Sequence, residues 1–217
     1  MKKIISIATA VFAVSAMSST DAVHAQTPSW YGGVAYGQSK SNVNAGEVND
    51  FLRSVGYGSP STSVDDKDKA YRFVLGYRLS PAVALEAFYA DLGNYGSRSN
   101  VATPFIGSVS ADYSAKGFGV DLILSAPLTD VFSVYGRLGV IQAKTEASFS
   151  SSGSVALLRG GGSKNKTGPH FGVGLQYEIS PTIGLRGEVE TYRKLGDEST
   201  GGELKVDAIS LGAIFRF

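Results

Sequence analysis

Apolar side chains recur at every second position in eight separate stretches of the chain. The stretches cover residues 30–37, 71–79, 83–91, 117–124, 132–140, 171–179, 183–190 and 206–217. In the second stretch, Phe73 and Leu75 alternate with Arg72 and Gly76. Successive side chains of a strand point to opposite faces, so a period of two predicts eight β-strands.

The composition of the two faces separates a membrane barrel from a soluble β-sandwich, which would also alternate. The polar face mixes charges near mid-strand with many glycines, as a narrow lumen requires. The apolar face carries aromatic residues towards both ends of an aliphatic band, which is typical of a lipid-facing barrel surface. These aromatic residues are Trp30, Tyr36, Tyr71, Tyr77, Tyr89, Phe118, Phe132, Phe171, Tyr177 and Phe215. The predicted fold is all-β, an eight-stranded antiparallel up-and-down transmembrane β-barrel.

The connections alternate between short and long. Short turns occur at Ser80-Pro81, at residues 127–130 and at residues 180–182. Long polar stretches lie at about 39–68, 93–114, 148–166 and 196–205. Short periplasmic turns and long extracellular loops are typical of outer-membrane barrels, so we expect these four stretches to be extracellular loops. Within the first, Val48, Phe51, Leu52 and Val55 have helical spacing and predict a short amphipathic helix over the barrel mouth.

The N-terminal segment has the features of a secretory signal peptide. Lys2 and Lys3 precede an apolar stretch over residues 4–17, and Ala25 ends a short polar run. This stretch is too short to span a membrane as a helix. We expect cleavage after Ala25, which leaves a barrel domain over residues 26–217 in the outer membrane of a Gram-negative cell.

Charge and composition narrow the function classes. Without the signal segment the chain is formally neutral and has no basic run, which argues against nucleic acid as a partner. The chain has no cysteine, and His170 is the one histidine after the signal segment, so neither a metal site nor another cofactor is expected. A lipid-modifying enzyme is the weakest of the functions considered. Such an enzyme needs a base beside a hydroxyl group, and no serine lies two residues from His170 on the same face, so we expect no catalysis.

The sequence resembles the transmembrane domain of the outer-membrane protein A family over essentially the whole chain after the signal. The resemblance rests on short motifs in matching order. They are Trp30-Tyr31-Gly32-Gly33, Gly76-Tyr77-Arg78-Leu79-Ser80-Pro81, Val134-Tyr135-Gly136-Arg137-Leu138-Gly139, Tyr177-Glu178-Ile179-Ser180-Pro181, Leu185-Arg186-Gly187-Glu188 and the C-terminal residues 210–217. The family's longer members continue into a periplasmic peptidoglycan-binding domain, which the resemblance does not extend to here.

The resemblance implies a charged network inside the barrel. Glu86, Arg137 and Arg186 match members of that network, whereas Gln176 replaces an acid and Ile123 stands near the family's interior lysine. Alternation independently places a set of charges inward. The predicted network comprises Arg72, Glu86, Asp121, Arg137, Gln176, Arg186, Glu188 and Glu190. Buried charges need partners, so this network either plugs the lumen or gates it for ions or small solutes.

The expected role is structural or adhesin-like surface interaction, with a low-conductance channel as the alternative. Expected partners are outer-membrane lipids and lipopolysaccharide, the outer-membrane assembly machinery and an extracellular or host-surface ligand of the loops, with the protein itself a monomer. Phe217 ends an alternating strand that resembles the signal read by the assembly machinery, so its deletion is expected to leave the protein in the periplasm.

Overall fold

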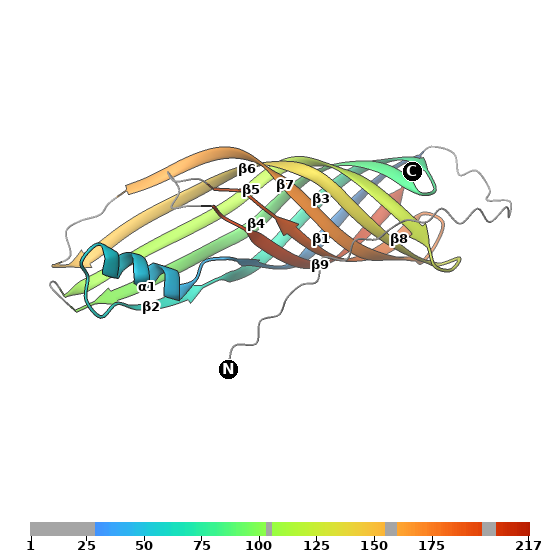
Figure 1. Ribbon diagram of the computed structural model, residues 1–217. Coiled ribbons are helices and arrows are strands. Elements are labelled where there is room, and N and C mark those ends of the chain that lie inside the picture. Colours follow the sequence, from blue (N-terminus) through green and yellow to red (C-terminus); the bar gives the residue numbers. More distant parts are fainter. Residues whose placement is uncertain (1–28, 103–105, 155–159, 197–202) are drawn as a thin grey trace.

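The computed structural model describes residues 29–102, 106–154, 160–196 and 203–217, which form nine strands and one helix (Figure 1). The elements run β1 (Ser29–Ser41), α1 (Ala45–Ser54), β2 (Ser61–Asp65), β3 (Lys67–Ser80), β4 (Val83–Val101), β5 (Gly107–Pro127), β6 (Phe132–Gly153), β7 (Gly160–Glu178), β8 (Ile183–Tyr192) and β9 (Val206–Arg216).

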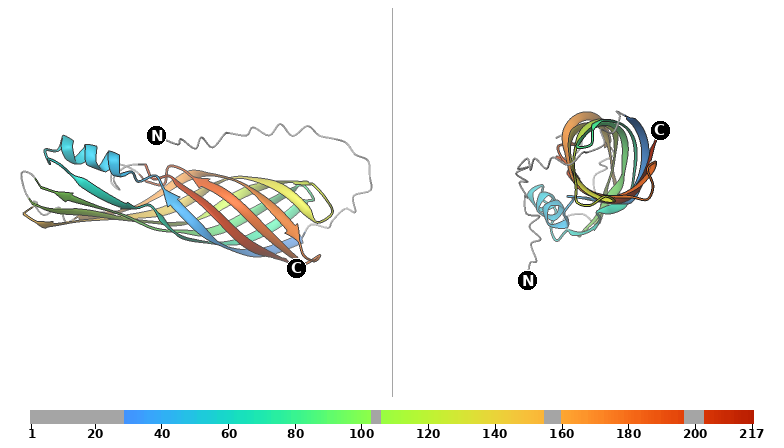
Figure 2. Two further views of the ribbon diagram at one scale, coloured as in Figure 1. Left: turned by 90° about the horizontal axis from the view of Figure 1, so that it is seen from below. Right: turned by 90° about the vertical axis from the view of Figure 1, so that its right-hand side faces the viewer.

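Eight of the strands close into an antiparallel barrel. Neighbouring strands follow the order β4-β3-β1-β9-β8-β7-β6-β5, and β4 also pairs with β5, which completes the ring. The end-on view in Figure 2 shows this ring directly. The predicted eight-stranded up-and-down barrel is therefore confirmed. None of the helices among the described residues has the length and apolar character needed to cross a membrane.

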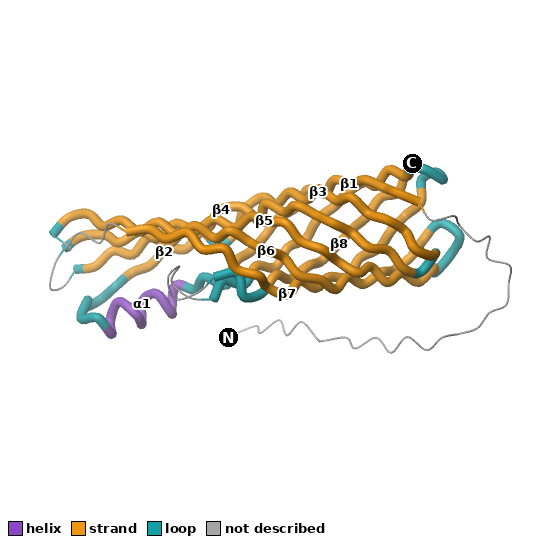
Figure 3. The backbone as a smooth tube through the Cα atoms, turned by 90° about the horizontal axis from the view of Figure 1, so that it is seen from above, coloured by secondary structure: helices purple, strands orange, loops and turns teal. Residues whose placement is uncertain are grey.

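Four strands continue well beyond the length that a bilayer requires. β4, β5, β6 and β7 contain 19, 21, 22 and 19 residues, whereas β8 and β9 contain 10 and 11. A strand of about 9–11 residues crosses the hydrocarbon core. The long strands leave the barrel at one end as a curved sheet, visible in Figure 3, which we call the extension. Much of the stretches 93–114 and 148–166, expected as loops, is therefore strand.

The remaining strand and the helix lie beside the extension. β2 pairs with the outer part of β4, where Ser61 faces Asn100 and Asp65 faces Gly96. The expected helix is present as α1, where buried Leu52 packs with Val101 of β4. The helix stands to the side of the ring and not across its mouth, which corrects that expectation (Figure 2). Only part of its apolar face is covered.

A β-bulge in β4 separates the barrel from the extension. Pairing between β4 and β5 shifts between Asp91 and Asn94, and Gly93 has a φ of 89°, in the left-handed region that glycine tolerates. Asp68 of β3 accepts a hydrogen bond from the backbone N–H of Asn94 at 2.7 Å. The bulge thus lies where β3 ends its pairing with β4.

Aromatic residues on the outer surface form cross-strand pairs near both ends of the aliphatic band. Trp30 lies 5.0 Å from Tyr77 between ring centroids, and Phe132 lies 4.8 Å from Tyr177. Towards the extension, the centroid distances are 5.2 Å for Tyr36–Tyr71 and 4.9 Å for Tyr89–Phe118. We call the second set, together with Phe171, the outer girdle. The expected signal segment and its cleavage site lie outside the described residues.

Candidate functional site

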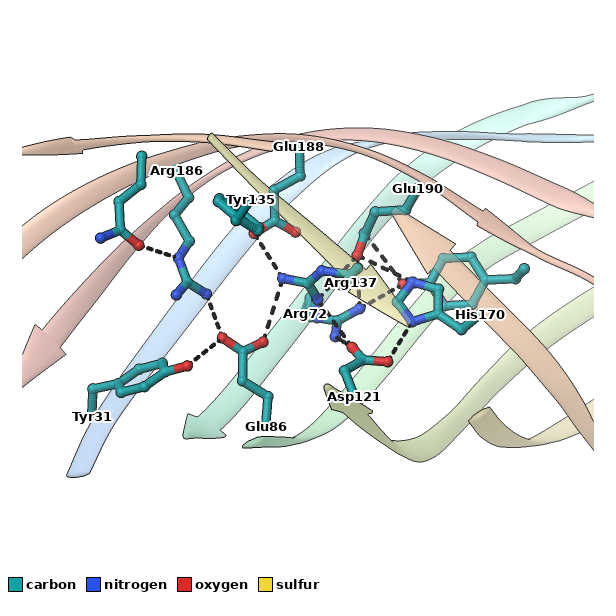
Figure 4. Close-up of polar contacts among 12 residues, drawn as sticks. Tyr31, Arg72, Glu86, Asp121, Tyr135, Arg137, His170, Arg186, Glu188 and Glu190 are labelled. Carbon is teal, nitrogen blue, oxygen red and sulfur yellow. Dashed lines mark hydrogen bonds and ion pairs between the residues drawn. The ribbon is translucent and has the colours of Figure 1, made fainter. Parts of the chain in front are cut away.

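Polar side chains fill the middle of the barrel lumen. They come from the inward faces of the barrel strands, because alternate positions of a strand point to the same side. Arg72 lies on β3, Arg137 on β6 and Arg186 on β8, and none of the three is more than 6% exposed. Figure 4 shows their guanidinium groups directed towards carboxylates from the facing strands. We call this set of side chains the lumen network.

The part of the network nearer the extension is built on two arginines that share acids. Arg72 Nη2 lies 2.5 Å from Asp121 Oδ2, and its Nη1 lies 2.8 Å from Glu190 Oε1. Arg137 Nη1 lies 3.2 Å from the same two oxygens. Each acid therefore meets two guanidinium groups, as buried carboxylates require to offset their desolvation.

The part nearer the short turns is centred on Glu86. Its Oε1 accepts hydrogen bonds from Arg186 Nη1 at 2.5 Å and from the Tyr31 hydroxyl at 2.8 Å. Gln176 accepts from Arg186 Nε at 2.8 Å and donates to Glu178. An amide at position 176 thus orients the arginine without adding a second negative charge.

Arg137 joins the two parts. Its Nη2 lies 3.0 Å from Glu188 Oε1 and 3.4 Å from Glu86 Oε2. The Tyr135 hydroxyl also donates to Glu188. Arg137 thereby contacts four carboxylates and is the residue on which the continuity of the network depends.

His170 lies at the end of the network towards the extension and is fully buried. Its Nδ1 is 2.9 Å from Asp121 Oδ1, and its Nε2 is 3.3 Å from Glu190 Oε1. Both ring nitrogens therefore face carboxylate oxygens and not a hydroxyl group. Among the described residues, no cluster of three or more potential metal ligands is suited to holding an ion.

An apolar layer covers the lumen network on the side of the extension. The layer includes Phe88, Ala90, Leu92, Tyr95, Ala115, Ile141, Ala143, Tyr192, Leu195, Leu204, Val206 and Ala208, all buried. Leu195 and Leu204 follow β8 and precede β9, and the N–H of Leu195 donates to the carbonyl of Leu204 at 3.0 Å. The Thr145 hydroxyl donates to the Leu195 carbonyl at 2.6 Å and ties this segment to β6.

A second apolar layer lies on the other side of the network. It consists of Tyr31, Ala84, Ile123, Tyr135 and Ile214, all buried. Ile123, at the position near the family's interior lysine, thus contributes packing and no charge. The charges around Arg137 lie between these two layers, and polar contacts continue towards the short turns from Gln176 through Glu178 to Arg216.

Glycines opposite the large inward rings allow this packing. A Cβ on Gly174 would overlap the Tyr135 ring, and a Cβ on Gly76 would overlap the Tyr31 ring. The lumen has no room for side chains at both positions of such a pair.

The eight residues predicted for the network all lie in the lumen and are 6% exposed or less. Sequence reasoning left out His170, Tyr31, Tyr135 and Tyr192, although alternation places all four inward. The three tyrosines supply hydroxyl donors to the network. Nothing in the alternation marks Leu195 or Leu204, since neither lies in a strand.

Comparisons with known proteins agree with this architecture. A family model described as "Outer membrane protein beta-barrel domain" matches residues 4–217. Outer membrane protein A of Shigella flexneri is 32% identical over 146 residues, and the match covers 65% of this chain and 38% of that protein. The chain therefore spans well under half of that relative's length.

Solved structures with a similar fold include small bacterial barrels. Ail, the attachment invasion locus protein of Yersinia pestis, is 19% identical, with 87% of this chain and 99% of that chain covered and a TM-score of 0.46. The outer membrane protein OprG of Pseudomonas aeruginosa is 16% identical, with 87% and 96% covered and a TM-score of 0.49.

Proposed function

The chain belongs to the outer membrane protein β-barrel domain family and localises to the outer membrane. On that premise we propose that it is a closed barrel whose extension presents a binding surface outside the cell. The orientation follows from the family pattern, in which short turns face the periplasm and the longer parts face outwards. The proposed role is adhesin-like or structural, and it is not catalytic.

The enclosure of the lumen network carries the closed-barrel part of the proposal. An ion that crosses the lumen would have to pass two buried apolar layers, one closed by Phe88 and Leu195 and the other by Tyr31 and Tyr135. Between them, every guanidinium group is held by carboxylates. Opening a path would therefore disturb ion pairs and apolar packing together, which a structural plug avoids.

The extension supports the surface-interaction part. It stands beyond the outer girdle, and its side carries apolar groups that no described residue covers. Phe51 of α1 and Val55, which follows the helix, are 65% and 52% exposed, and Ile106, just before β5, is 76% exposed. Exposed apolar groups outside the lipid region are typical of contact sites for other macromolecules.

Single-channel recording tests the closed lumen. We expect no current steps from the protein inserted in a planar bilayer, with the heat-dependent shift in gel mobility as proof of folding. Leu195→Ala combined with Phe88→Ala should introduce leak currents, because it removes the bulk of the outer apolar layer. Discrete steps from the unmodified protein that change with Arg186→Ala would contradict the proposal and favour the alternative, a low-conductance channel.

Cell adhesion tests the surface role separately. Bacteria that display the protein should adhere to immobilised host-cell extracts more strongly than bacteria that display Phe51→Ser/Val55→Ser. A Lys194→Ser variant at the same end of the barrel is the control and should adhere normally. Equal adhesion of all three strains and of a strain without the protein would contradict an adhesin-like role.

A further inference from the structure

The distribution of lysine over the barrel is strongly asymmetric. Arginines occur in the lumen, in the extension and near the short turns, whereas the lysines of the described residues all lie at or beyond the outer girdle. They are Lys40, Lys67, Lys69, Lys116, Lys144, Lys164, Lys166, Lys194 and Lys205. The three short turns at the other end contain no lysine. Because the ammonium groups occur at a single rim of the barrel, they indicate that anionic groups lie on that side of the membrane.

Two of these lysines face each other directly across neighbouring strands. Lys116 of β5 is the register partner of Lys144 of β6, and both side chains are exposed on the outside of the barrel. They lie one outward-facing position beyond Phe118 and its partner Gln142, so they stand just above the outer girdle. Like charges directly opposite in a sheet are destabilising, so the stability of the fold does not account for this pair of lysines.

The neighbouring acids do not neutralise both ammonium groups, so the lysine pair can still bind an anion. Lys144 Nζ lies 2.5 Å from Glu146 Oε1, so one ammonium has an ion-pair partner. Asp91 faces Lys116 across β4 and β5, but its carboxylate accepts from the N–H of Gly93 at 3.0 Å in the bulge. Lys116 forms no ion pair of its own among the described residues, and Glu146 also attracts it at longer range.

An apolar groove lies directly below the lysine pair on the lipid-facing surface. It has a volume of about 760 Å³ and runs across β3 to β7. The groove is deepest at Ala87, whose small side chain lies between the larger Leu75 and Val120. Val140 follows as the register partner of Val120. Phe73, Tyr89 and Phe118 form its wall towards the extension. Such a groove fits an acyl chain.

A polar hollow lies directly above the lysine pair, on the outer face of the extension. It has a volume of about 680 Å³. Its outward-facing lining includes Asn94, Arg98, Asp112, Glu146 and several serines. Amide, carboxylate, guanidinium and hydroxyl groups of this kind bind the hydroxyl groups of sugars through hydrogen bonds.

We propose that the outer face of β4 to β6 binds a phosphorylated glycolipid of the outer leaflet, with a phosphate on Lys116 and Lys144, an acyl chain in the apolar groove and sugar in the polar hollow. The order of the three sites along the strands matches the order of the three parts in such a lipid. A phosphate between the two ammonium groups also removes their mutual repulsion. This proposal is independent of whether the lumen conducts.

Native mass spectrometry of the detergent-solubilised protein with diphosphorylated lipid A tests the lysine pair. Each basic residue near an anionic lipid contributes about fivefold in affinity. Lys116→Gln/Lys144→Gln should therefore weaken lipid A binding about 25-fold. The matched control is Lys40→Gln/Lys67→Gln, which removes the other directly opposed lysine pair, on β1 and β3. That pair lies beyond Tyr36 and Tyr71 and outside the groove, so the control should bind normally.

Two further probes separate the parts of the lipid. Dephosphorylated lipid A and phosphatidylglycerol should both bind more weakly than diphosphorylated lipid A. Val120→Phe, which fills the groove with another apolar group, should weaken lipid A binding while the protein still shows the heat-dependent mobility shift of a folded barrel.

Three results would overturn the proposal. Equal losses in the two double-lysine variants would indicate general attraction to a basic rim. Equal binding of dephosphorylated lipid A would exclude the phosphate contact, and equal binding of phosphatidylglycerol would exclude recognition of the glycolipid.

Discussion

His170 stacks on Tyr192, with ring centroids 4.2 Å apart and ring planes at 11°. The stack lies at the boundary between the lumen network and the outer apolar layer. The edge of the imidazole meets Asp121 and Glu190, while its face packs on a ring that belongs to the apolar layer. One residue therefore connects charged and apolar packing.

Two substitutions of His170 separate these contributions. His170→Phe keeps the ring packing but removes both contacts to carboxylates, so we expect a loss of about 1–3 kcal/mol in the free energy of unfolding. His170→Ala should lose more, because it adds a cavity beside Tyr192. Urea unfolding in lipid vesicles, followed by gel mobility, measures both. A phenylalanine variant as stable as the unmodified protein would show that the carboxylate contacts contribute nothing.

Removal of Arg137 should be the most damaging single change in the lumen network. Arg137→Leu leaves four carboxylates with fewer cationic partners, and the loss of one member of a buried ion pair costs about 3–5 kcal/mol. The same urea titration checks this value. Arg98→Leu, on the exposed face of the extension, is the control and should change the unfolding free energy by less than about 0.5 kcal/mol.

The lumen glycines should be intolerant of a single added methyl group. Gly174→Ala would push the Tyr135 ring away from Glu188 and should cost about 1–3 kcal/mol through overpacking. The matched control is Gly136→Ala, where the nearest atom to the new Cβ is 4.0 Å away. Thermal unfolding monitored by gel mobility compares the two variants. Equal midpoints would contradict the packing derived for the lumen.

Asp68 should titrate at unusually low pH. Partial burial acts to raise its pKa, but hydrogen bonds from the backbone N–H groups of Asn94 and Lys69 outweigh this and hold the pKa below the ordinary aspartate value. A lowered folded-state pKa stabilises the bulge above the unfolded-state pKa, and this stabilisation is lost as pH falls through the folded-state pKa. Nuclear magnetic resonance should show the Asn94 amide shift changing with a midpoint below about 3.9. Asp68→Asn should abolish that change, and an ordinary midpoint would contradict the contact.

The membrane-spanning part of the fold was predictable because lipid imposes a strong contrast between the two faces of each strand. Phe73 against Arg72 and Leu185 against Arg186 reveal the alternation at once. The contrast disappears in the extension, where water lies outside. There Ser97 and Ser99 point inwards between the outward Arg98 and Asn100, so both faces are polar and the strand resembles a loop.

The membership of the lumen network followed from alternation, but its connections did not. Arg137 and Glu86 are 51 positions apart in the chain, and they meet through the register in which β4 pairs with β5 and β5 with β6, which alternation alone does not give. The outer apolar layer was missed for a different reason. Leu195 and Leu204 reach the lumen from positions outside the strands, and a periodic pattern carries no information about such residues.

The bulge at Asp91–Asn94 also resets which positions of β4 face inwards. Below it the buried residues have even numbers, such as Phe88 and Ala90, and above it they have odd numbers, such as Tyr95 and Ser97. A one-residue insertion within the membrane part of β4 would exchange lipid-facing and lumen-facing side chains. An insertion at the bulge changes only the phase of the extension. The bulge therefore separates the register of the extension from that of the membrane-spanning part. The exposed part of the protein can gain or lose residues there during evolution, while the same side chains of the membrane-spanning part still face the lipid and the lumen.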